Sequence, residues 1–282
     1  MNMDFFSGRR LAIATKHGKE KVIRPALSIL EGVELFVPEG FDTDAYGTFS
    51  GEIERSSAPL ESARRKCTDA CRAYNCTLAI SSEGSFGPHP YLPFVHADDE
   101  ILLLLDWENN LEIKVREITT TTNFNGQLLK NRAEVDAFAG KVLFPSHGLI
   151  LRRDKDATDD LTKGVADIQT LDKLVNIYLS KYGQVYVETD MRAMYNPTRM
   201  EVIGRAARKL SDVILRTCPQ CNTPGFDVAD VVNGLPCELC GNPTKSTLSY
   251  IYICQKCHYS EDKMYPKGKT SETPMYCDYC NP

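Results

Sequence analysis

The sequence predicts an α/β protein with a mixed sheet flanked by helices, followed by a small cysteine-rich module. Three observations lead to this prediction. Apolar runs with strand and helix periodicity alternate between residues 10 and 215. Eight of the eleven cysteines fall in four CxxC pairs within the last 65 residues. The chain has 282 residues, 42% of them apolar and 25% charged, which suits one α/β domain plus a small module.

Strand and helix patterns follow one another through the α/β region, with polar segments between them. Strands are predicted at 10–15, 33–38, 77–82, 100–107, 111–120, 141–145, 148–153 and 185–189. Helices are predicted at 16–27, 59–74, 132–139 and 167–183, and from Pro197 toward Cys218. Segments 39–57, 83–90 and 155–164 are rich in turn-forming residues and are predicted to be loops.

Two of these helices carry specific signals. The helix after Pro59 has apolar residues at helical spacing, namely Leu60, Ala63, Cys67, Ala70 and Tyr74. Three cysteines in or near it (Cys67, Cys71 and Cys76) are expected to be small buried residues. The last helix begins with Asn196, a favourable N-cap, and has proline at its first position. The basic runs at 63–66 and 151–153 are predicted to face solvent.

Composition and charge exclude several classes of protein. The formal net charge of −5 argues against a dedicated nucleic-acid coat. The longest strongly apolar run, "ILLLLD" at 101–106, is far too short to span a bilayer. The first ten residues lack the basic-then-apolar layout of a signal peptide. We therefore expect a cytoplasmic protein without membrane contact.

The spacing of the CxxC pairs is typical of four-thiolate zinc sites, because two thiolates on one tight turn occupy two corners of a tetrahedron. The pairs are Cys218/Cys221, Cys237/Cys240, Cys254/Cys257 and Cys277/Cys280, with 15, 13 and 19 residues between them. Joining the first pair to the second and the third to the fourth gives the usual spacing, and a cross-braced arrangement is the alternative. Two zinc ions are predicted, and both are structural because four thiolates leave no position open for water.

Residues 216–282 are thus expected to form a double zinc ribbon, after an α/β ligand-binding or catalytic domain at 1–215. The ribbon segment has six Lys or Arg and seven Asp or Glu residues. A phosphate-binding surface needs a positive balance, so nucleic acid is an unlikely partner. The ribbon could instead dock a protein partner.

Polar side chains follow two of the predicted strands near the N-terminus. Ligands in open α/β sheets tend to bind beyond the carboxyl ends of the strands. The turn after the first strand is predicted to hold phosphate at a helix N-terminus, and it contains Thr15, Lys16, His17 and Lys19. The glycine-rich turn after residue 82 offers Glu83 and Ser85.

The third polar strand end is "VETDMRAMYNPTRM", at 187–200. Glu188 and Asp190 are two residues apart on an extended segment, so both can face one side and hold a hard cation such as Mg²⁺. Arg192, Asn196 and Arg199 could then clamp a phosphate-bearing ligand. The alternative is that the pairs Glu188–Arg192 and Asp190–Arg199 only anchor the last helix, and the sequence leaves both open.

The stretch 188–282 resembles a bacterial family classed as a domain of unknown function. The segments that carry the resemblance are "TDMRAMYNPTRM", "CPQCNTPGF", "GLPCELCGNPT" and "YCDYCNP". The family has zinc-binding CxxC pairs at its C-terminus, and the resemblance implies the same here.

Residues 10–90 resemble the inosine-triphosphate pyrophosphatase fold more weakly. Members carry a Thr/Ser-x-Asn-x-x-Lys turn after the first strand, which Thr15 begins here, although His17 replaces the Asn and Lys19 comes one residue early. Their Thr-Phe-x-Glu-Asn segment corresponds to Thr48-Phe49, with Glu52 one residue late. Glu83 and the glycine after it fall at the family's acidic turn. The resemblance implies a nucleotide or phosphate-ligand pocket with a divalent cation.

Two functional hypotheses follow. The first is a Mg²⁺-dependent hydrolase or binder of a nucleotide or related phosphate compound. In it, lysines hold phosphate, and Glu83, Glu188 or Asp190 hold metal or activate water. The second is a non-catalytic adaptor that uses its zinc ribbon to bind a protein.

Overall fold

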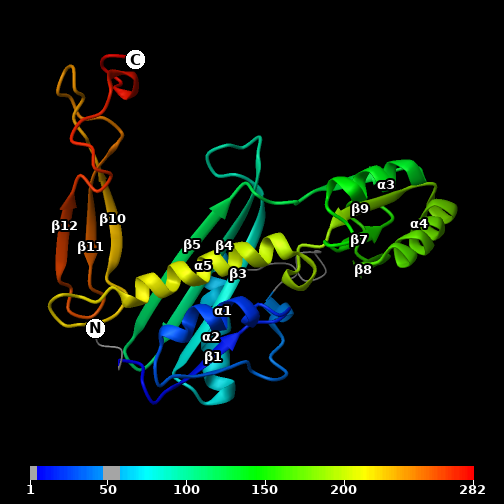
Figure 1. Ribbon diagram of the computed structural model, residues 1–282, viewed down its shortest axis with the longest axis horizontal. Coiled ribbons are helices and arrows are strands. Elements are labelled where there is room, and N and C mark those ends of the chain that lie inside the picture. Colours follow the sequence, from blue (N-terminus) through cyan, green and yellow to red (C-terminus); the bar gives the residue numbers. More distant parts are fainter. Residues whose placement is uncertain (1–4, 47–57) are drawn as a thin grey trace. The chain divides into compact units, whose positions relative to one another are not determined.

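The computed structural model describes residues 5–46 and 58–282 of the chain. These divide into two compact units, called here the body (Phe6–Leu210) and the cysteine module (Phe5 with Ser211–Pro282). The helices and strands of both are labelled in Figure 1. Thr48, Phe49 and Glu52 of the predicted ligand site lie outside the described residues.

The first part of the body is built on a five-stranded mixed sheet, which confirms the predicted fold class. The strands lie in the order β2-β1-β3-β4-β5, with β1 parallel to β2 and β3, and with β4 antiparallel to both β3 and β5. Their bounds are β1 (Arg10–Ala14), β2 (Glu34–Phe36), β3 (Leu78–Pro88), β4 (His96–Asp106) and β5 (Leu111–Thr119).

Helix α2 (Pro59–Tyr74) covers one face of this sheet. Alternate strand residues point to opposite faces, and one set packs with the helix in a buried cluster. This cluster comprises Ala12, Ala14, Ala79, Leu103 and Leu105 of the sheet with Ala63, Cys67, Ala70 and Cys71 of α2. Ala63, Cys67 and Ala70, which the sequence places at helical spacing, are therefore on the buried face of α2.

Helices α1 (Glu20–Ala26) and α5 (Pro197–Leu215) lie on the other face. Two contacts join α5 to β5: Arg205 Nε donates to Glu117 at 3.3 Å, and Lys209 Nζ donates to the carbonyl of Arg116 at 2.7 Å. Gly204 of α5 packs against α1, because a Cβ there would lie 3.6 Å from Val22. The body therefore has helices on both faces of its larger sheet, as Figure 1 shows.

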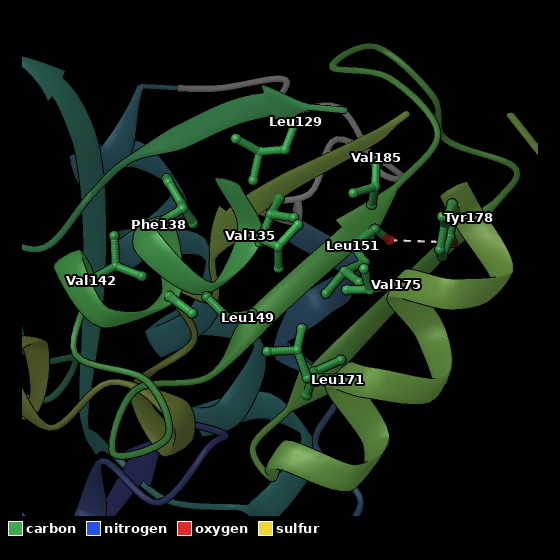
Figure 2. Packing of buried hydrophobic residues seen from close by; sticks show 13 residues of the cluster. Leu129, Val135, Phe138, Val142, Leu149, Leu151, Leu171, Val175, Tyr178 and Val185 are labelled. Atoms are coloured by element: carbon green, nitrogen blue, oxygen red, sulfur yellow. Dashed lines mark hydrogen bonds between the residues drawn. The ribbon is translucent and has the colours of Figure 1, made fainter. Parts of the chain in front are cut away.

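The second part of the body is a four-stranded antiparallel sheet in the order β6-β9-β7-β8. Its elements are β6 (Gly126–Leu129), α3 (Arg132–Lys141), β7 (Leu149–Arg152), β8 (Leu161–Val165), α4 (Ile168–Tyr182) and β9 (Val185–Thr189). Figure 2 shows the packing of α3 and α4 on this sheet, around Val135, Leu151 and Val175, with the Tyr178 hydroxyl donating to the Leu151 carbonyl at 3.3 Å.

Three sequence predictions about single elements were wrong. Residues 142–146 form turns after α3 instead of a strand. Residues 83–88 continue strand β3 instead of turning, since every one of them pairs with β4. Residues 161–164 of the predicted connector belong to β8 (Leu161–Val165), which pairs with β7. In the last two cases a neighbouring strand supplies the hydrogen bonds, and local turn propensity is overridden.

The cysteine module contains a three-stranded antiparallel sheet in the order β10-β11-β12. The strands are β10 (Asp227–Asn233), β11 (Thr247–Ile253) and β12 (Ser260–Met264).

Short 3₁₀ helices occur in both units, at Leu27–Ile29, Thr43–Tyr46, Ala193–Tyr195 and Pro274–Tyr276. Among the residues described, no helix has both the length and the apolar character that crossing a membrane would require.

Candidate functional site

The eight C-terminal cysteines gather into two groups of four. One group is Cys218, Cys221, Cys254 and Cys257, and the other is Cys237, Cys240, Cys277 and Cys280. Within each group all sulfur atoms lie within 4.8 Å of one another, and the closest pairs are 3.5–3.9 Å apart. A tetrahedral zinc ion with Zn–S bonds of about 2.3 Å has sulfurs about 3.8 Å apart. Both groups therefore fit a four-thiolate zinc ion.

The pairing of the cysteines is interleaved, so the sequential pairing favoured by their spacing was wrong and the cross-braced alternative holds. The reason is the antiparallel sheet. Asp227 at the start of β10 pairs with Ile253 at the end of β11, which brings the first and third CxxC turns to one end of the sheet. The second CxxC turn follows the C-terminal end of β10, and the fourth follows the C-terminal end of β12. Both strands run antiparallel to β11, so these two turns lie at the other end of the sheet.

Each CxxC turn is closed by the same backbone hydrogen bond, from the residue after the second cysteine to the carbonyl of the first. The four donors are Asn222, Gly241, His258 and Asn281, at 2.8–3.1 Å. A hydrogen bond from the backbone N–H of Asn242 lowers the pKa of Cys240 to about 7. The pKa of Cys280, by contrast, is raised to about 12 by the hydrogen bond between Cys280 and Cys240. Four crowded thiols cannot all ionise alone, and a divalent cation would remove that obstacle.

A second group of functional interest lies in the body, where six charged side chains are buried together. This charged cluster consists of Lys19, Lys66, Glu83, Asp98, Glu100 and Arg199, all less than 9% exposed. It surrounds β3 just past the end of β1, whose last residue pairs with Ser81. Burial of charge is costly unless each group is paired, so the contacts of each decide what the cluster can do.

Lys19 precedes α1 and turns its side chain inward. Its Nζ donates to the hydroxyl of Ser82 at 2.8 Å. Burial, together with the positive charges of Arg199 and Lys66, lowers the pKa of Lys19 to about 7, and the nearby Glu100 and Glu83 oppose the shift. Lys19 is therefore a lysine that can gain or lose a proton near neutral pH.

Lys66 of α2 contacts the Glu83 carboxylate, and both residues are 7% exposed. Glu83 thus lies on the α2 face of β3. The expectation that the basic run at 63–66 is solvated was wrong for Lys66. The helical spacing could have indicated that Lys66 is buried. Lys66 is three residues after Ala63 and just before Cys67, both of which lie on the buried face of the helix.

Arg199 and Glu100 form a buried ion pair on the opposite face. Arg199 Nε donates to Glu100 Oε1 at 2.6 Å, and the guanidinium carbon lies 5.1 Å from the centre of the Phe86 ring. Glu100 pairs across the ladder with Gly84. A Cβ on Gly84 would lie 2.5 Å from Arg199 Nη2 and closer still to Glu100 Oε1, so the pair requires glycine at this position.

Asp98 lies two residues before Glu100 on the same face of β4. Burial, together with the negative charge of Glu100, raises the pKa of Asp98 to about 8. Among the residues that the structure describes, Asp98 Oδ1 and Glu100 Oε2 have no hydrogen-bond partner. A third carboxylate oxygen of the charged cluster, Glu83 Oε1, also lacks a hydrogen bond of regular geometry but contacts Lys66 Nζ.

The remaining residues of the first two predicted ligand turns have local roles. Lys16 pairs with Asp42 at 2.9 Å, and the Thr15 hydroxyl donates to the carbonyl of Lys16 at 3.2 Å. His17 Nδ1 lies 3.3 Å from the Met194 sulfur. Ser85 is half-buried inside β3. The expected anion site at a helix N-terminus is not retained, because α1 has only seven residues and its first-turn N–H groups bond to the carbonyls of Gly18 and Lys19.

The carboxylates of the third strand end are held by partners of their own. Glu188 contacts Arg152 of β7, and burial raises the pKa of Glu188. Asp190 accepts hydrogen bonds from Gly164 N at 3.0 Å and from the backbone and guanidinium of Arg192 at 2.6–3.2 Å. Arg152 is buried, so the expectation that 151–153 is solvated was wrong for this residue. Glu188 and Asp190 thus have the contacts of ion-pair anchors. Their partners are Arg152 and Arg192, in place of the expected Arg192 and Arg199.

Asn196 has the capping role that the sequence predicted. Its Oδ1 accepts from the backbone N–H of Arg199 at 2.9 Å, and its Nδ2 donates to Asn123 at 2.8 Å. The cap fixes the first turn of α5 and so positions Arg199 against Glu100.

A family model for a domain of unknown function, DUF6671, matches residues 66–282. The chain belongs to the DUF6671 family. The match confirms the first of the two resemblances, and it covers both cysteine groups and every member of the charged cluster except Lys19. No curated protein matches the chain. The likeness of residues 10–90 to the inosine-triphosphate pyrophosphatase fold stays a prediction.

Proposed function

We propose that the body of this DUF6671 chain binds a small phosphate-bearing compound at the charged cluster and hydrolyses it. A nucleotide is the first candidate. The observation that carries the proposal is Lys19, a buried lysine with a pKa of about 7 that the charges of Glu83 and Glu100 both influence. Burial of Lys19 with five other charged groups costs stability. Groups buried at such a cost, with shifted pKa values, concentrate at functional sites.

The cluster has complementary parts for such a ligand. When protonated, Lys19 can donate to a phosphate oxygen, and it already lies 2.8 Å from a second donor, the Ser82 hydroxyl. The negative charge of the ligand would raise the pKa of Lys19, so binding would hold the proton at Nζ. Glu100 Oε2, which has no hydrogen-bond partner among the described residues, could accept a proton from an attacking water.

A divalent cation fits this site only together with the ligand. In the described part of the chain, the two cysteine groups are the only sets of three or more His, Cys, Asp or Glu side chains close enough to hold a metal. Mg²⁺ typically takes one or two carboxylates plus water and phosphate oxygens. Asp98 and Glu100 could supply the carboxylates, and the cation would neutralise charge on the phosphate group.

A panel of nucleoside mono-, di- and triphosphates and pyrophosphate tests the proposal, with phosphate release measured with and without added Mg²⁺. The zinc-loaded protein should be used without chelator, since chelation would unfold the cysteine module. Lys19→Met should abolish turnover, and Lys21→Met, which changes an exposed lysine in the first turn of α1, should retain it. Absence of turnover and of binding across the panel would contradict the proposal.

A second candidate function is docking of a protein partner by the cysteine module. Four large apolar side chains are exposed in the segments that carry the second cysteine group: Leu239 (72%), Met275 (67%), Tyr276 (63%) and Tyr279 (69%). Such residues in one small module favour an adaptor role. Cross-linking in extracts with wild type and with the Leu239→Ser/Tyr279→Ser variant tests it, because a genuine partner should be lost only from the variant.

We further propose that the protein works in a reducing compartment such as the cytoplasm, because the zinc sites need eight reduced thiols. Duplex nucleic acid is not among the proposed ligands, given the net charge of −5.

A further inference from the structure

Two cysteines outside the cysteine module lie next to each other at the end of α2. Cys71 is in the last turn of the helix, and Cys76 is in the link from the helix to β3. Both side chains belong to the same buried cluster, and Cys76 Sγ lies 3.4 Å from the carbonyl oxygen of Leu78. Cys71 is 2% exposed and Cys76 is 7% exposed.

The backbone holds this contact in place. The C-cap of helix α2 is Asn75, which has a left-handed conformation (φ 48°, ψ 54°), and both Asn75 and Cys76 donate their N–H groups to the carbonyl of Cys71. The Cys76 N–H to Cys71 O distance is 3.2 Å. Reversal of the chain at a left-handed residue brings positions five apart in sequence next to each other. The proximity of the thiols is therefore fixed by the helix cap.

The two thiols have opposite acidities. Interaction with the Cys71 thiol lowers the pKa of Cys76 to about 7 against the effect of burial, with help from the Ala12 N–H and the charge of Arg10. The same interaction, together with burial, raises the pKa of Cys71. Such a pair has one thiol that attacks as a thiolate and one that resolves.

We propose that Cys71 and Cys76 are a redox-active dithiol, which closes into an intrachain disulfide by exchange with a low-molecular-weight disulfide. The Cys76 thiolate attacks one sulfur of the small disulfide and releases one small thiolate. The Cys71 thiol then loses its proton and attacks the Cys76 sulfur, which releases the second small thiolate. The protein loses two electrons and the small disulfide gains them, so one disulfide is exchanged for another.

The third cysteine of the region is the matched control. Cys67 is one helical turn before Cys71 and is fully buried. Its sulfur lies 3.7 Å from the carbonyl oxygen of Leu103, and burial raises its pKa to about 12. Cys67 should therefore stay reduced when the other two react.

A disulfide at this position would tie the end of α2 to the link before β3. These two elements carry Lys66 and Glu83, the ion pair of the charged cluster. The crosslink would restrain the elements that hold that pair. The dithiol proposal does not depend on the proposed hydrolase function, since it rests only on the cap and the two thiols.

The test is oxidation of the zinc-loaded protein with oxidised glutathione, followed by alkylation of free thiols and mass spectrometry. Trypsin cleaves after Arg72 and Asp-N cleaves before Asp69, so a double digest separates Cys67, Cys71 and Cys76 into different peptides. We expect a Cys71–Cys76 linkage as the main product, with zinc content unchanged. Cys71→Ser and Cys76→Ser should abolish it, and Cys67→Ser should not.

Two results would overturn the proposal. The first is a Cys76 that remains free for alkylation after oxidation of the wild type. The second is a mixture of Cys67–Cys76 and Cys71–Cys76 linkages in similar amounts, which would show random oxidation. Circular dichroism of each serine variant establishes that loss of the linkage does not come from loss of fold.

Discussion

Arg199 donates to Glu100 across 99 residues of sequence at 2.6 Å, and both side chains are at most 1% exposed. The pair joins the first turn of α5 to β4. Glu100→Gln leaves the buried guanidinium without its counter-charge, and we expect it to lower the free energy of unfolding by about 3–5 kcal/mol. Urea denaturation of the two proteins measures this.

The control for that change is a more exposed ion pair between α5 and β5, the strand next to β4. Arg205 of α5 pairs with Glu117 of β5 at 3.3 Å, with side chains 39% and 24% exposed. Glu117→Gln should cost no more than about 1 kcal/mol. Equal losses in the two variants would contradict the assignment of Arg199 and Glu100 as a buried pair.

Gly84 is expected to tolerate no side chain. A Cβ at this position meets Arg199 Nη2 and Glu100 Oε1, whereas a Cβ on Gly87, later in the same strand, meets no atom within 4 Å. Gly84→Ala should lower the free energy of unfolding by about 1–3 kcal/mol through overpacking, and Gly87→Ala should leave it nearly unchanged. The same denaturation measurement checks both, and a stable Gly84→Ala protein would show that the ion pair can move aside.

Asp98 gives stability a defined dependence on pH. Its pKa is raised from an ordinary value of 3.8 to about 8, so the folded state holds this proton more tightly than the unfolded state. The contribution of Asp98 to stability is complete below the lower value and is lost as the pH rises through the higher one. Asp98→Asn should remove this loss.

The comparison is the free energy of unfolding at about pH 5 and about pH 7, since between the two pKa values Asp98 is ionised in the unfolded state and protonated in the folded state. Wild type should lose stability relative to Asp98→Asn as the pH rises. Asp99→Asn is the control, because Asp99 points to the other face and pairs with the exposed Arg116. Parallel curves for wild type and Asp98→Asn would refute the buried-acid assignment.

The interleaved zinc pairing can be tested by zinc content. Cys221 and Cys254 belong to one group, although they come from the first and third CxxC pairs. Each single serine variant should lose one zinc ion of two, and the Cys221→Ser/Cys254→Ser double variant should also lose only one. Loss of both ions from the double variant would favour sequential pairing.

The sequence predicts those features of this chain that depend on neighbours along the chain. Helical spacing located α2, α4 and α5, the Asn196-Pro197 pair located the start of α5, and the CxxC pairs identified all eight thiolates. Each of these patterns is set by contacts within one or two turns.

Features that depend on distant segments could not be obtained this way. The partners of the cysteine turns follow from the order of strands in a sheet, and the charged cluster joins α1, α2, β3, β4 and α5. Asp98 and Glu100 were missed because the strand was expected to start near residue 100, whereas β4 begins at His96. Glu188 and Arg152 were assigned other roles because their contact joins two strands that are 36 residues apart.

The most direct test of the proposed function is proton uptake by Lys19 on ligand binding. Because the pKa of Lys19 is about 7, most of the lysine is neutral near pH 8, and a bound phosphate group should recharge it. Calorimetric titration with a Mg²⁺–nucleoside triphosphate, in buffers of different ionisation enthalpy, measures the uptake. The account predicts uptake of a large fraction of one proton by wild type and by Lys21→Met, and no binding by Lys19→Met. Binding that takes up no proton, or that survives Lys19→Met unchanged, would contradict it.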